Sequence, residues 1–400
     1  MERLDILLYA HDGRGIGHVS RTAAVGLALR RRHPDLRVAL LSGERRVEGL
    51  VRGAPLDWIK LPSYATRVVE GRSQGAPGDC GLSDAALGEA RAELIRAAAA
   101  TLRPRVALAD HTPQGKHREL VPALEATSGG TAWVLGVRAV VGGVGKVWSD
   151  LAAGLFRKHF RTLFWYGDRN VSPTEAERLE SHFGRAPDVC GYVSRLRELD
   201  AAGLLAPAGM RRGVVMGLSW ADAASPGLLR AVSEAAARTC KTLGPWRIFL
   251  DYGRGEGAGT VREEAARLFS GVPGATLCDF GEAYADAMAG ARLAVVYGGY
   301  NSLTDVLAAD IGGVVLLRGM KDNEQELHVA GLAARRPDLV PLDAARLDAT
   351  GLVQGLEKAL AAAPVRSCRA EAVSIDGAAR AADLLAALVR ESRSKEGEGA

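Results

Sequence analysis

Residues 293–309 read LAVVYGGYNSLTDVLAA, and this stretch decides the fold. Its first part, Leu293–Tyr297, is an apolar run without polar alternation, as in a parallel strand covered on both faces. Two glycines follow, and the residues from Asn301 to Ala309 then have the spacing of a helix. A strand that turns through glycines into a helix places the free N–H groups of the helix N-terminus at the carboxyl end of the strand. The stretch therefore predicts an α/β domain with a turn suited to a diphosphate.

The same order of strand, loop and helix recurs along most of the chain. Further apolar runs predict strands at 6–10, 38–42, 106–110, 132–137, 163–166, 213–216, 247–251, 276–279 and 314–317. Helical patterns lie between them, at 20–31, 84–102, 228–240, 260–269 and 324–334. Alternation of strand and helix is typical of doubly wound parallel sheets. The predicted fold class is therefore α/β.

Two domains are expected in a chain of 400 residues. The charged segment 194–212 loses the strand pattern and is interpreted as a linker, so we predict an N-terminal domain at 1–193 and a C-terminal domain at 210–365. Residues 366–392 predict a terminal helix that packs back on the N-terminal domain. Residues 63–83 are rich in Gly, Pro and Ser and predict a long loop, and the polar tail 391–400 predicts disorder.

Composition excludes several classes of protein. The net charge is +4 and no run of five like charges occurs, so no nucleic-acid partner is expected. Five scattered cysteines without a CxxC pair favour free thiols in a reducing compartment. We expect neither a signal peptide nor a membrane span, since no basic segment precedes a long apolar stretch near Met1 and no uncharged apolar run reaches about 18 residues. A soluble cytoplasmic protein is predicted, and only the stretch 155–161, LFRKHFR, leaves a weak peripheral membrane contact open beside its reading as a half-buried surface helix.

The first strand leads into a glycine-rich loop, HDGRGIGH at 11–18, that opens a helix. Its glycines, Gly15 and Gly17 among them, let the backbone approach a ligand. His18 lies at a helix N-terminus, where the dipole favours a neutral imidazole, so it is a candidate general base. Asp110, which ends the strand at 106–110 beside His111, is the second candidate. A capping histidine and an ordinary tight turn remain the plainer interpretations of this loop.

The loops of the C-terminal half are candidates for binding a phosphorylated ligand. Ser302 offers a hydroxyl at the glycine turn, and the Asp305 carboxylate in the first turns of that helix can accept hydrogen bonds from two ribose hydroxyls. Residues 317–325, LRGMKDNEQ, begin another helix with polar side chains, and Arg318 or Lys321 can meet phosphate charge. Residues 217–222, which include Gly217 and Ser219, and residues 251–257 are further glycine-bearing loops that either contact ligand or are plain turns.

These motifs resemble those of GT-B glycosyltransferases. The similarity is greatest to the lipid-linked N-acetylglucosaminyltransferase of peptidoglycan synthesis and to related predicted glycosyltransferases, which show GGYN[ST], then an arginine, then Glu-Gln. The N-terminal GxGxGHxxR motif also looks like theirs, and so do the tripeptides YGD at 166–168 and GYV at 191–193. The resemblance covers nearly the whole chain. This chain departs from the pattern at Arg138, which an alanine follows where those relatives often have aspartate, and at the thinned loop after Gly217.

The resemblance implies two Rossmann-like domains that face each other across a cleft, and it implies roles for individual residues. Asp305 would contact the ribose, Glu324 and Gln325 the donor sugar, and the first glycine loop with His18 the acceptor. The implied diphosphate contacts are Gly298, Gly299, Tyr300, Asn301 and Ser302. The other residues that we expect at the acceptor side of the cleft are Arg21, His111 and Arg138.

The expected function is therefore sugar transfer from a nucleoside-diphosphate sugar to a small-molecule acceptor, plausible in natural-product biosynthesis. We expect inversion at the anomeric carbon, no cofactor, and no metal because the chain contains no Asp-x-Asp motif. Backbone amides of the C-terminal domain, together with Arg318, would stabilise the leaving nucleoside diphosphate. Two alternatives stay open: a sugar-nucleotide 2-epimerase, and a non-catalytic nucleotide-sugar-binding subunit.

Overall fold

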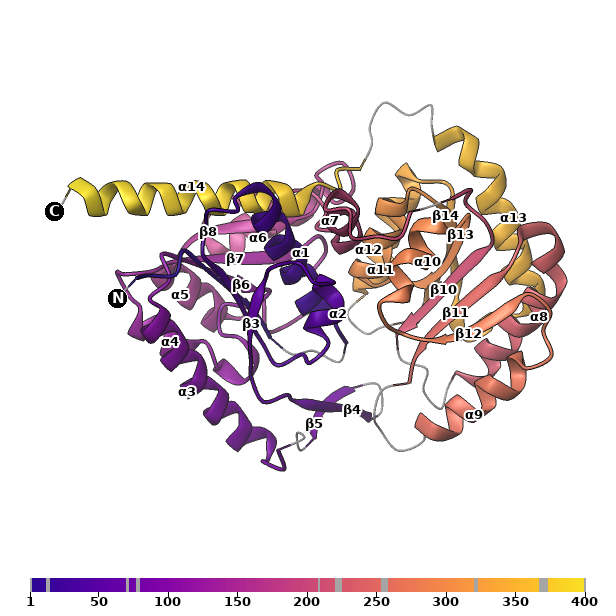
Figure 1. The fold of residues 1–400 in the computed structure, drawn as a ribbon, viewed down its shortest axis with the longest axis horizontal. Coiled ribbons are helices and arrows are strands. Elements are labelled where there is room, and N and C mark those ends of the chain that lie inside the picture. Colours follow the sequence, from indigo (N-terminus) through magenta and orange to yellow (C-terminus); the bar gives the residue numbers. More distant parts are fainter. Residues whose placement is uncertain are drawn as a thin grey trace. The chain divides into compact units, whose positions relative to one another are not determined.

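The structure is a computed structural model that describes residues 2–11, 15–69, 72–76, 80–207, 209–219, 225–252, 258–319, 323–366 and 373–398. The chain forms two compact units (Figure 1). Unit 1 comprises Met1–Ala202 and Ser374–Ala400, and unit 2 comprises Gly203–Val373. The unit boundary lies inside the segment 194–212, for which the sequence predicts a linker.

Unit 1 contains a seven-stranded parallel sheet in the order β3-β2-β1-β6-β7-β8-β9. Its strands are β1 (Ile6–Ala10), β2 (Val38–Ser42), β3 (Asp57–Lys60), β6 (Val106–Asp110), β7 (Ala132–Arg138), β8 (Phe160–Tyr166) and β9 (Asp188–Val189). Its helices are α1 (Gly17–Arg32), α2 (Val47–Val51), α3 (Asp84–Leu102), η1 (Lys116–Arg118), α4 (Val121–Ala126), α5 (Asp150–His159), α6 (Pro173–Phe183), α7 (Arg195–Ala201) and α14 (Gly377–Glu398). The chain fills one half of the sheet with β1, β2 and β3 and then the other half from β6, so strand order reverses between β1 and β6.

Burial on both faces explains the apolar strands of unit 1. Leu7 and Tyr9 belong to a core that also includes residues of α3, α5 and α6, together with Trp133 and Trp165. Leu8 points to the opposite face, where a methyl group added at Gly26 of α1 would meet its side chain at 3.2 Å. Both faces of β1 are therefore covered by helices, as the continuous apolar run predicts.

Unit 2 contains a six-stranded parallel sheet in the order β12-β11-β10-β13-β14-β15. Its strands are β10 (Val214–Ser219), β11 (Trp246–Asp251), β12 (Ala275–Asp279), β13 (Leu293–Tyr297), β14 (Gly312–Leu317) and β15 (Leu339–Asp343). Its helices are α8 (Pro226–Leu243), α9 (Ala258–Phe269), α10 (Ala283–Gly290), α11 (Tyr300–Ala309), α12 (Glu324–Arg335), η2 (Ala344–Arg346) and α13 (Ala349–Arg366). Strand order reverses here between β10 and β13, so both units are doubly wound.

Several predicted elements differ from the structure. Residues 63–83 contain a hairpin of β4 (Ala65–Val69) and β5 (Arg72–Ala76) in place of a loop without strands. The predicted linker contains α7, which begins after Ser194, whose hydroxyl accepts from the Arg197 N–H at 3.2 Å. The terminal helix begins at Gly377 instead of 366, and it continues to Glu398 through most of the tail for which disorder is predicted.

The stretch 155–161 spans the end of α5 and the start of β8. Phe156 and Phe160 are buried, and their rings stack with centroids 5.7 Å apart. Phe156 also packs against Phe183 of α6 at 4.8 Å. These aromatic rings belong to the core of unit 1 and are not available to a bilayer. None of the helices in the described part of the chain combines the length and apolar character needed to cross a membrane.

The chain returns to unit 1 through residues 374–377, which dock on the GYV motif at 191–193. Tyr192 N–H donates to the Ser374 carbonyl at 2.8 Å, and Gly377 N–H donates to the Tyr192 carbonyl at 2.9 Å. Gly191 has φ +88°, and a methyl group added at Gly377 would lie 2.3 Å from the Gly191 carbonyl oxygen. The glycines therefore permit a close backbone approach, which gives this motif a structural role in unit 1.

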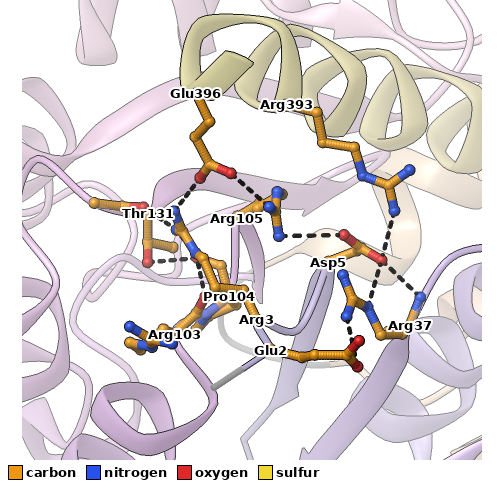
Figure 2. Close-up of polar contacts among 11 residues, drawn as sticks. Glu2, Arg3, Asp5, Arg37, Arg103, Pro104, Arg105, Thr131, Arg393 and Glu396 are labelled. Carbon is orange, nitrogen blue, oxygen red and sulfur yellow. Dashed lines mark hydrogen bonds and ion pairs between the residues drawn. The ribbon is translucent and has the colours of Figure 1, made fainter. Parts of the chain in front are cut away.

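Helix α14 packs along α1 and is held at the amino ends of β1 and β6 by ion pairs (Figure 2). Asp5, fully buried, accepts hydrogen bonds from the Arg37 side chain at 3.2 Å and from Arg393 of α14 at 2.9 Å. Glu396 of α14 pairs with Arg105 at 2.5 Å and with Arg3. Burial alone would raise the pKa of Asp5, but the hydrogen bonds from Arg37 and Arg393 outweigh it and lower that pKa.

Candidate functional site

The point where strand order reverses in unit 1 brings together side chains that are distant in sequence. His18 and Arg21 lie three residues apart in the first turns of α1, so they share one face of the helix. Asp110 is the last residue of β6, the strand beside β1. The Asp110 carboxylate accepts from His18 Nδ1 at 2.5 Å and from the Arg21 Nε at 2.9 Å and Nη2 at 2.8 Å. Ligands of open α/β sheets bind at such reversal points, outside the carboxyl ends of the strands.

The charges of this cluster fix the protonation of its members. Burial would raise the pKa of Asp110, but the Arg21 charge and the hydrogen bond with His18 outweigh it and hold that pKa far below its usual value. An ionised carboxylate only accepts hydrogen bonds, so the His18 proton is assigned to Nδ1. The lone pair of His18 is consequently on Nε2, the nitrogen that faces away from Asp110.

Two more histidines border His18. The His11 ring, directly after β1, lies 3.9 Å from the His18 ring between centroids, and its Nδ1 is 3.3 Å from the Asp110 carbonyl oxygen. The His111 ring centroid lies 5.6 Å from that of His18. Burial lowers the pKa of all three histidines, and nearby cations, including Arg21, Arg138 and Lys116, add to this effect. All three imidazoles are therefore neutral at pH 7.

His11, His18 and Asp110 each offer a ligand atom within 4.8 Å of the others, a spacing that suits a metal ion. Arg21, however, already binds both oxygens of the carboxylate. A divalent ion on Asp110 would lie beside this guanidinium charge, which opposes its binding. The electrostatics of the cluster favour a neutral or anionic ligand over a cation.

The structure places the other predicted residues of unit 1 as follows. Gly17 is the first residue of α1, and Gly15 precedes it by two positions, both at the same end of β1 as His18. Arg138 ends β7 beside Asp110, and its charge contributes to the low pKa of His18 and His111. Residues 12–14 of the glycine loop lie outside the described residues. His11 is absent from the residues that the sequence singles out, although its position directly after β1 was an available signal.

Unit 2 places its glycine turn at its own reversal point. β13 ends at Tyr297, Gly298 N–H donates to the Leu316 carbonyl at 3.1 Å, and α11 begins at Tyr300 after Gly299. A methyl group added at Gly298 would meet Val329 at 3.1 Å, whereas nothing lies within 4 Å of one at Gly299. Gly298 is therefore needed for packing, and Gly299 leaves open space over the helix N-terminus. Asn301, Ser302 and Asp305 follow in the first turns of α11, all half-buried.

Residues from both ends of the predicted loop 317–325 lie at this turn. Gln325, in its first turn, lies 3.4 Å from the methyl position of Gly298 and is 9% exposed, like Glu324. Its Oε1 is buried without a hydrogen-bond partner among the described residues. Arg318 lies over the Tyr297 ring at 4.2 Å. Four predicted positions thus lie at the carboxyl ends of β13 and β14, namely Gly298, Arg318, Glu324 and Gln325.

One neighbour of this cluster is missed by the sequence interpretation. His328 is 1% exposed and stacks on the Tyr300 ring with centroids 6.0 Å apart. It lies four residues after Glu324, hence on the same face of α12. This spacing is the signal that would have found it.

Only parts of the predicted loops at 217–222 and 251–257 lie within the described residues. β10 continues to Ser219, so Gly217 lies within the strand and not in a loop. A methyl group added there would meet the Tyr284 ring at 2.6 Å, so this glycine allows α10 to pack closely on the sheet. Ser219 ends the strand at the reversal point. Residues 220–224, 253–257 and 320–322, including Lys321, lie outside the described residues.

Known structures with the same architecture include both glycosyltransferases and epimerases. A protein from Listeria monocytogenes provisionally assigned as a UDP-N-acetylglucosamine 2-epimerase aligns with TM-score 0.64 and 13% identity over 98% of each chain. MurG of Acinetobacter baumannii aligns with TM-score 0.54 and 15% identity over 96% of this chain and 100% of its own. The glycosyltransferase VinC, in a complex with dTDP, aligns with TM-score 0.58 and 12% identity over 97% and 100%. No protein-family model and no curated protein matches the sequence.

These likenesses show the fold. The chain has the two-domain α/β architecture of GT-B proteins, which confirms the fold class and the resemblance to GT-B glycosyltransferases. Glycosyltransferases and an epimerase both occur among these structures, so the fold alone does not define the reaction.

Proposed function

We propose that this protein is a glycosyltransferase that moves a sugar from a nucleoside-diphosphate sugar to a small-molecule acceptor. The observation that carries the proposal is the His18–Asp110–Arg21 cluster at the reversal point of unit 1. It consists of a neutral imidazole oriented through Nδ1 by an ionised carboxylate, with Nε2 available to accept a proton. That arrangement is suited to general-base catalysis on a hydroxyl.

The proposed step is a direct displacement with inversion. The acceptor hydroxyl gives its proton to His18 Nε2 while its oxygen forms a bond to the anomeric carbon. The bond from that carbon to the diphosphate oxygen breaks, and the nucleoside diphosphate leaves with the electron pair. Asp110 stabilises the imidazolium that forms. In this step His18 is the base, and Asp110, the second candidate for that role, supports it.

Unit 2 is proposed to bind the donor. Backbone N–H groups at the start of α11 and the Arg318 guanidinium would meet the diphosphate charge, and the leaving group gains negative charge in the same place. Asp305 would accept from the ribose hydroxyls. The buried Gln325 Oε1, without a hydrogen-bond partner among the described residues, suits a donor-sugar hydroxyl. We propose that these groups act without a metal, so a chelator is expected to leave the rate unchanged.

One observation keeps an epimerase as a second candidate. Three neutral histidines lie around Asp110, and removal and return of a proton on a bound sugar needs several acid–base groups of this kind. Epimerisation needs only the nucleotide sugar, whereas transfer needs an acceptor. Incubation with the nucleotide sugar alone therefore separates the candidates, because only the epimerase converts it to its 2-epimer.

The donor site is tested by thermal unfolding with UDP, GDP, dTDP, ADP or CDP in the presence of a chelator. A ligand at one hundred times its Kd stabilises the folded protein by about 2.7 kcal/mol, or very roughly 5–10 °C in midpoint for a domain of this size. Asp305→Ala should abolish the shift, and Asp310→Asn, an exposed position just past the end of the same helix, should keep it. If no nucleotide shifts the midpoint, the donor site is not where we place it.

The base is tested by the release of nucleoside diphosphate. His18→Ala should lower kcat by about 10²- to 10⁴-fold, while the nucleotide-induced thermal shift stays as in the wild type. A variant that loses both would indicate a structural role for His18, and one that loses neither would remove His18 from the mechanism.

A further inference from the structure

His111 is a buried polar side chain with two ring nitrogens that make no hydrogen bond to any described residue. Its residue is 4% exposed, and neither Nδ1 nor Nε2 has a hydrogen-bond partner within the part of the chain that the structure describes. Folded proteins seldom leave buried polar atoms in this state, because both are desolvated without compensation. The ring therefore marks a position where a ligand with hydrogen-bonding groups can bind.

The backbone holds His111 in an unfavourable conformation to place the ring there. Its φ is +81°, the left-handed region that non-glycine residues seldom adopt. Its N–H donates to the Gly136 carbonyl at 2.8 Å, which fixes the residue between the carboxyl ends of β6 and β7. The ring centroid lies 5.6 Å from that of His18, the proposed base. Strain of this kind is typical of functional positions.

The chemistry of the ring selects the group that it can bind. Burial, and then the charge of Arg138, hold the pKa of His111 well below its ordinary value, so the imidazole is neutral. A neutral imidazole offers one N–H donor and one lone pair. A hydroxyl also has both a donor and an acceptor, whereas an ammonium group only donates and a carboxylate only accepts. A hydroxyl can therefore bind at either ring nitrogen, by accepting from the N–H or by donating to the lone pair, whereas each of the charged groups fits only one of the two.

A second buried polar atom without a hydrogen-bond partner among the described residues, Gln114 Oε1, lies in the same loop after β6. Gln114 is 5% exposed, and its amide nitrogen donates to the Lys146 carbonyl at 2.8 Å. Its Oε1 is buried, again without a hydrogen-bond partner among the described residues. Two residues of the loop after β6 thus hold polar atoms that a ligand rich in hydroxyls would satisfy.

From this arrangement we propose that His111 binds the acceptor hydroxyl next to the one that His18 deprotonates, so that the acceptor is a vicinal diol such as a sugar or cyclitol. This inference rests on the proposed function. A hydrogen bond between a ring nitrogen and an oxygen spans about 2.7–3.2 Å, and the two ring centroids lie 5.6 Å apart, close enough for each ring to bind one of two adjacent oxygens. An acceptor with a single hydroxyl would leave His111 buried and unsatisfied, and the enzyme would discriminate against it.

The acceptor class is tested with matched probes. The rate of nucleoside diphosphate release is measured with methyl glucosides, myo-inositol and cis-1,2-cyclohexanediol, and with cyclohexanol as the monohydroxy counterpart. At least one diol should accelerate release, and cyclohexanol should not. The proposal fails if cyclohexanol accelerates release as much as the diols do, or if no diol accelerates it while the nucleotide sugar is still bound and slowly hydrolysed. If the nucleotide sugar is neither bound nor hydrolysed, the proposed function itself fails.

The role of His111 is tested with His111→Phe, which keeps a ring and removes its hydrogen bonds. The KM for the diol should rise about tenfold with little change in kcat, because the lost bond is made to a hydroxyl that does not react. His111→Asn, whose amide also donates and accepts and whose residue type tolerates positive φ, should restore part of the loss.

A matched control is available in the same loop. His117 also has positive φ, +53°, but its Nε2 is already paired with Asp84 at 2.9 Å. His117→Phe should leave the KM for the diol unchanged. If His111→Phe and His117→Phe change KM equally, or if His111→Phe lowers thermal stability while KM stays constant, His111 has a packing role and the proposal is wrong.

Discussion

Replacement of Asp5 by asparagine should loosen helix α14 from unit 1 without unfolding unit 2. The Asp5 carboxylate is fully buried and holds Arg393 of α14 at 2.9 Å and Arg37 at 3.2 Å (Figure 2). An asparagine keeps one acceptor oxygen and turns an NH₂ group toward the guanidinium donors. Each bond between charged groups contributes about 1.5–3 kcal/mol.

The two arginines are 41% and 40% exposed, so solvent screens part of this energy. We therefore expect a loss of about 2–3 kcal/mol, less than the 3–5 kcal/mol of a fully buried pair. If α14 opens as a local unit, its amides should exchange about 30- to 150-fold faster at pH 7, since 1.4 kcal/mol is a factor of ten. The amides of α13 in unit 2 should not change.

The control for Asp5→Asn is Glu2→Gln. Glu2 pairs with the same Arg37 at 3.1 Å but is 89% exposed, so its loss should cost less than about 0.5 kcal/mol. The pKa of Asp5 is lowered in the folded state, so its contribution is present above the unfolded value of about 3.9 and is lost as pH falls through the folded value. Equal exchange rates in Asp5→Asn and wild type at pH 7, or equal acceleration in α13, would refute the reasoning.

Three other outcomes are expected. Asp110→Asn removes the group that raises the pKa of His18, so the acidic limb of the kcat profile should move to lower pH; movement to higher pH would contradict the assignment. The lowered pKa values of the three histidines mean that the unfolded chain binds more protons than the folded protein below about pH 6.5. In urea denaturation, the free energy of unfolding should therefore decrease as the pH is lowered, by up to about 4 kcal/mol per pH unit, and by about 1.4 kcal/mol per unit less in His111→Phe. Gly377→Ala, which crowds Gly191, should accelerate amide exchange in α14, whereas Gly397→Ala, with nothing within 4 Å, should not.

The buried strands could be read from the sequence because burial on two faces leaves an unbroken apolar run. Strands β1, β2, β6 and β13 have the predicted bounds for this reason. Strand β3 was missed because Asp57–Lys60 forms the edge of its sheet, where polar and exposed residues are tolerated. Helix α7 was missed because its charges suggest solvent, although Glu198 is 2% exposed and pairs with Arg31 at 2.7 Å.

The composition of the site was harder to predict than its location. Loops that leave parallel strands were rightly the places to search, but which loops meet depends on strand order, and 92 residues separate His18 from Asp110. His111 was a candidate by position only. Its ring nitrogens are buried without a partner among the described residues, and this burial depends on the pairing of β7 with β6, which the sequence does not show.

The spacing of three between His18 and Arg21 explains how the proposed base stays neutral beside a carboxylate. An ionised Asp110 alone would raise the pKa of His18 and favour the imidazolium, which has no lone pair for a proton. Arg21, on the same face of α1, binds both oxygens of Asp110 and opposes that effect, so that burial prevails and the pKa of His18 falls. Asp110 can then orient His18 through Nδ1 without charging it. In the proposed mechanism, the GHxxR part of the motif, at 17–21, thus places in the first turns of α1 both the base and the arginine that keeps it able to accept a proton.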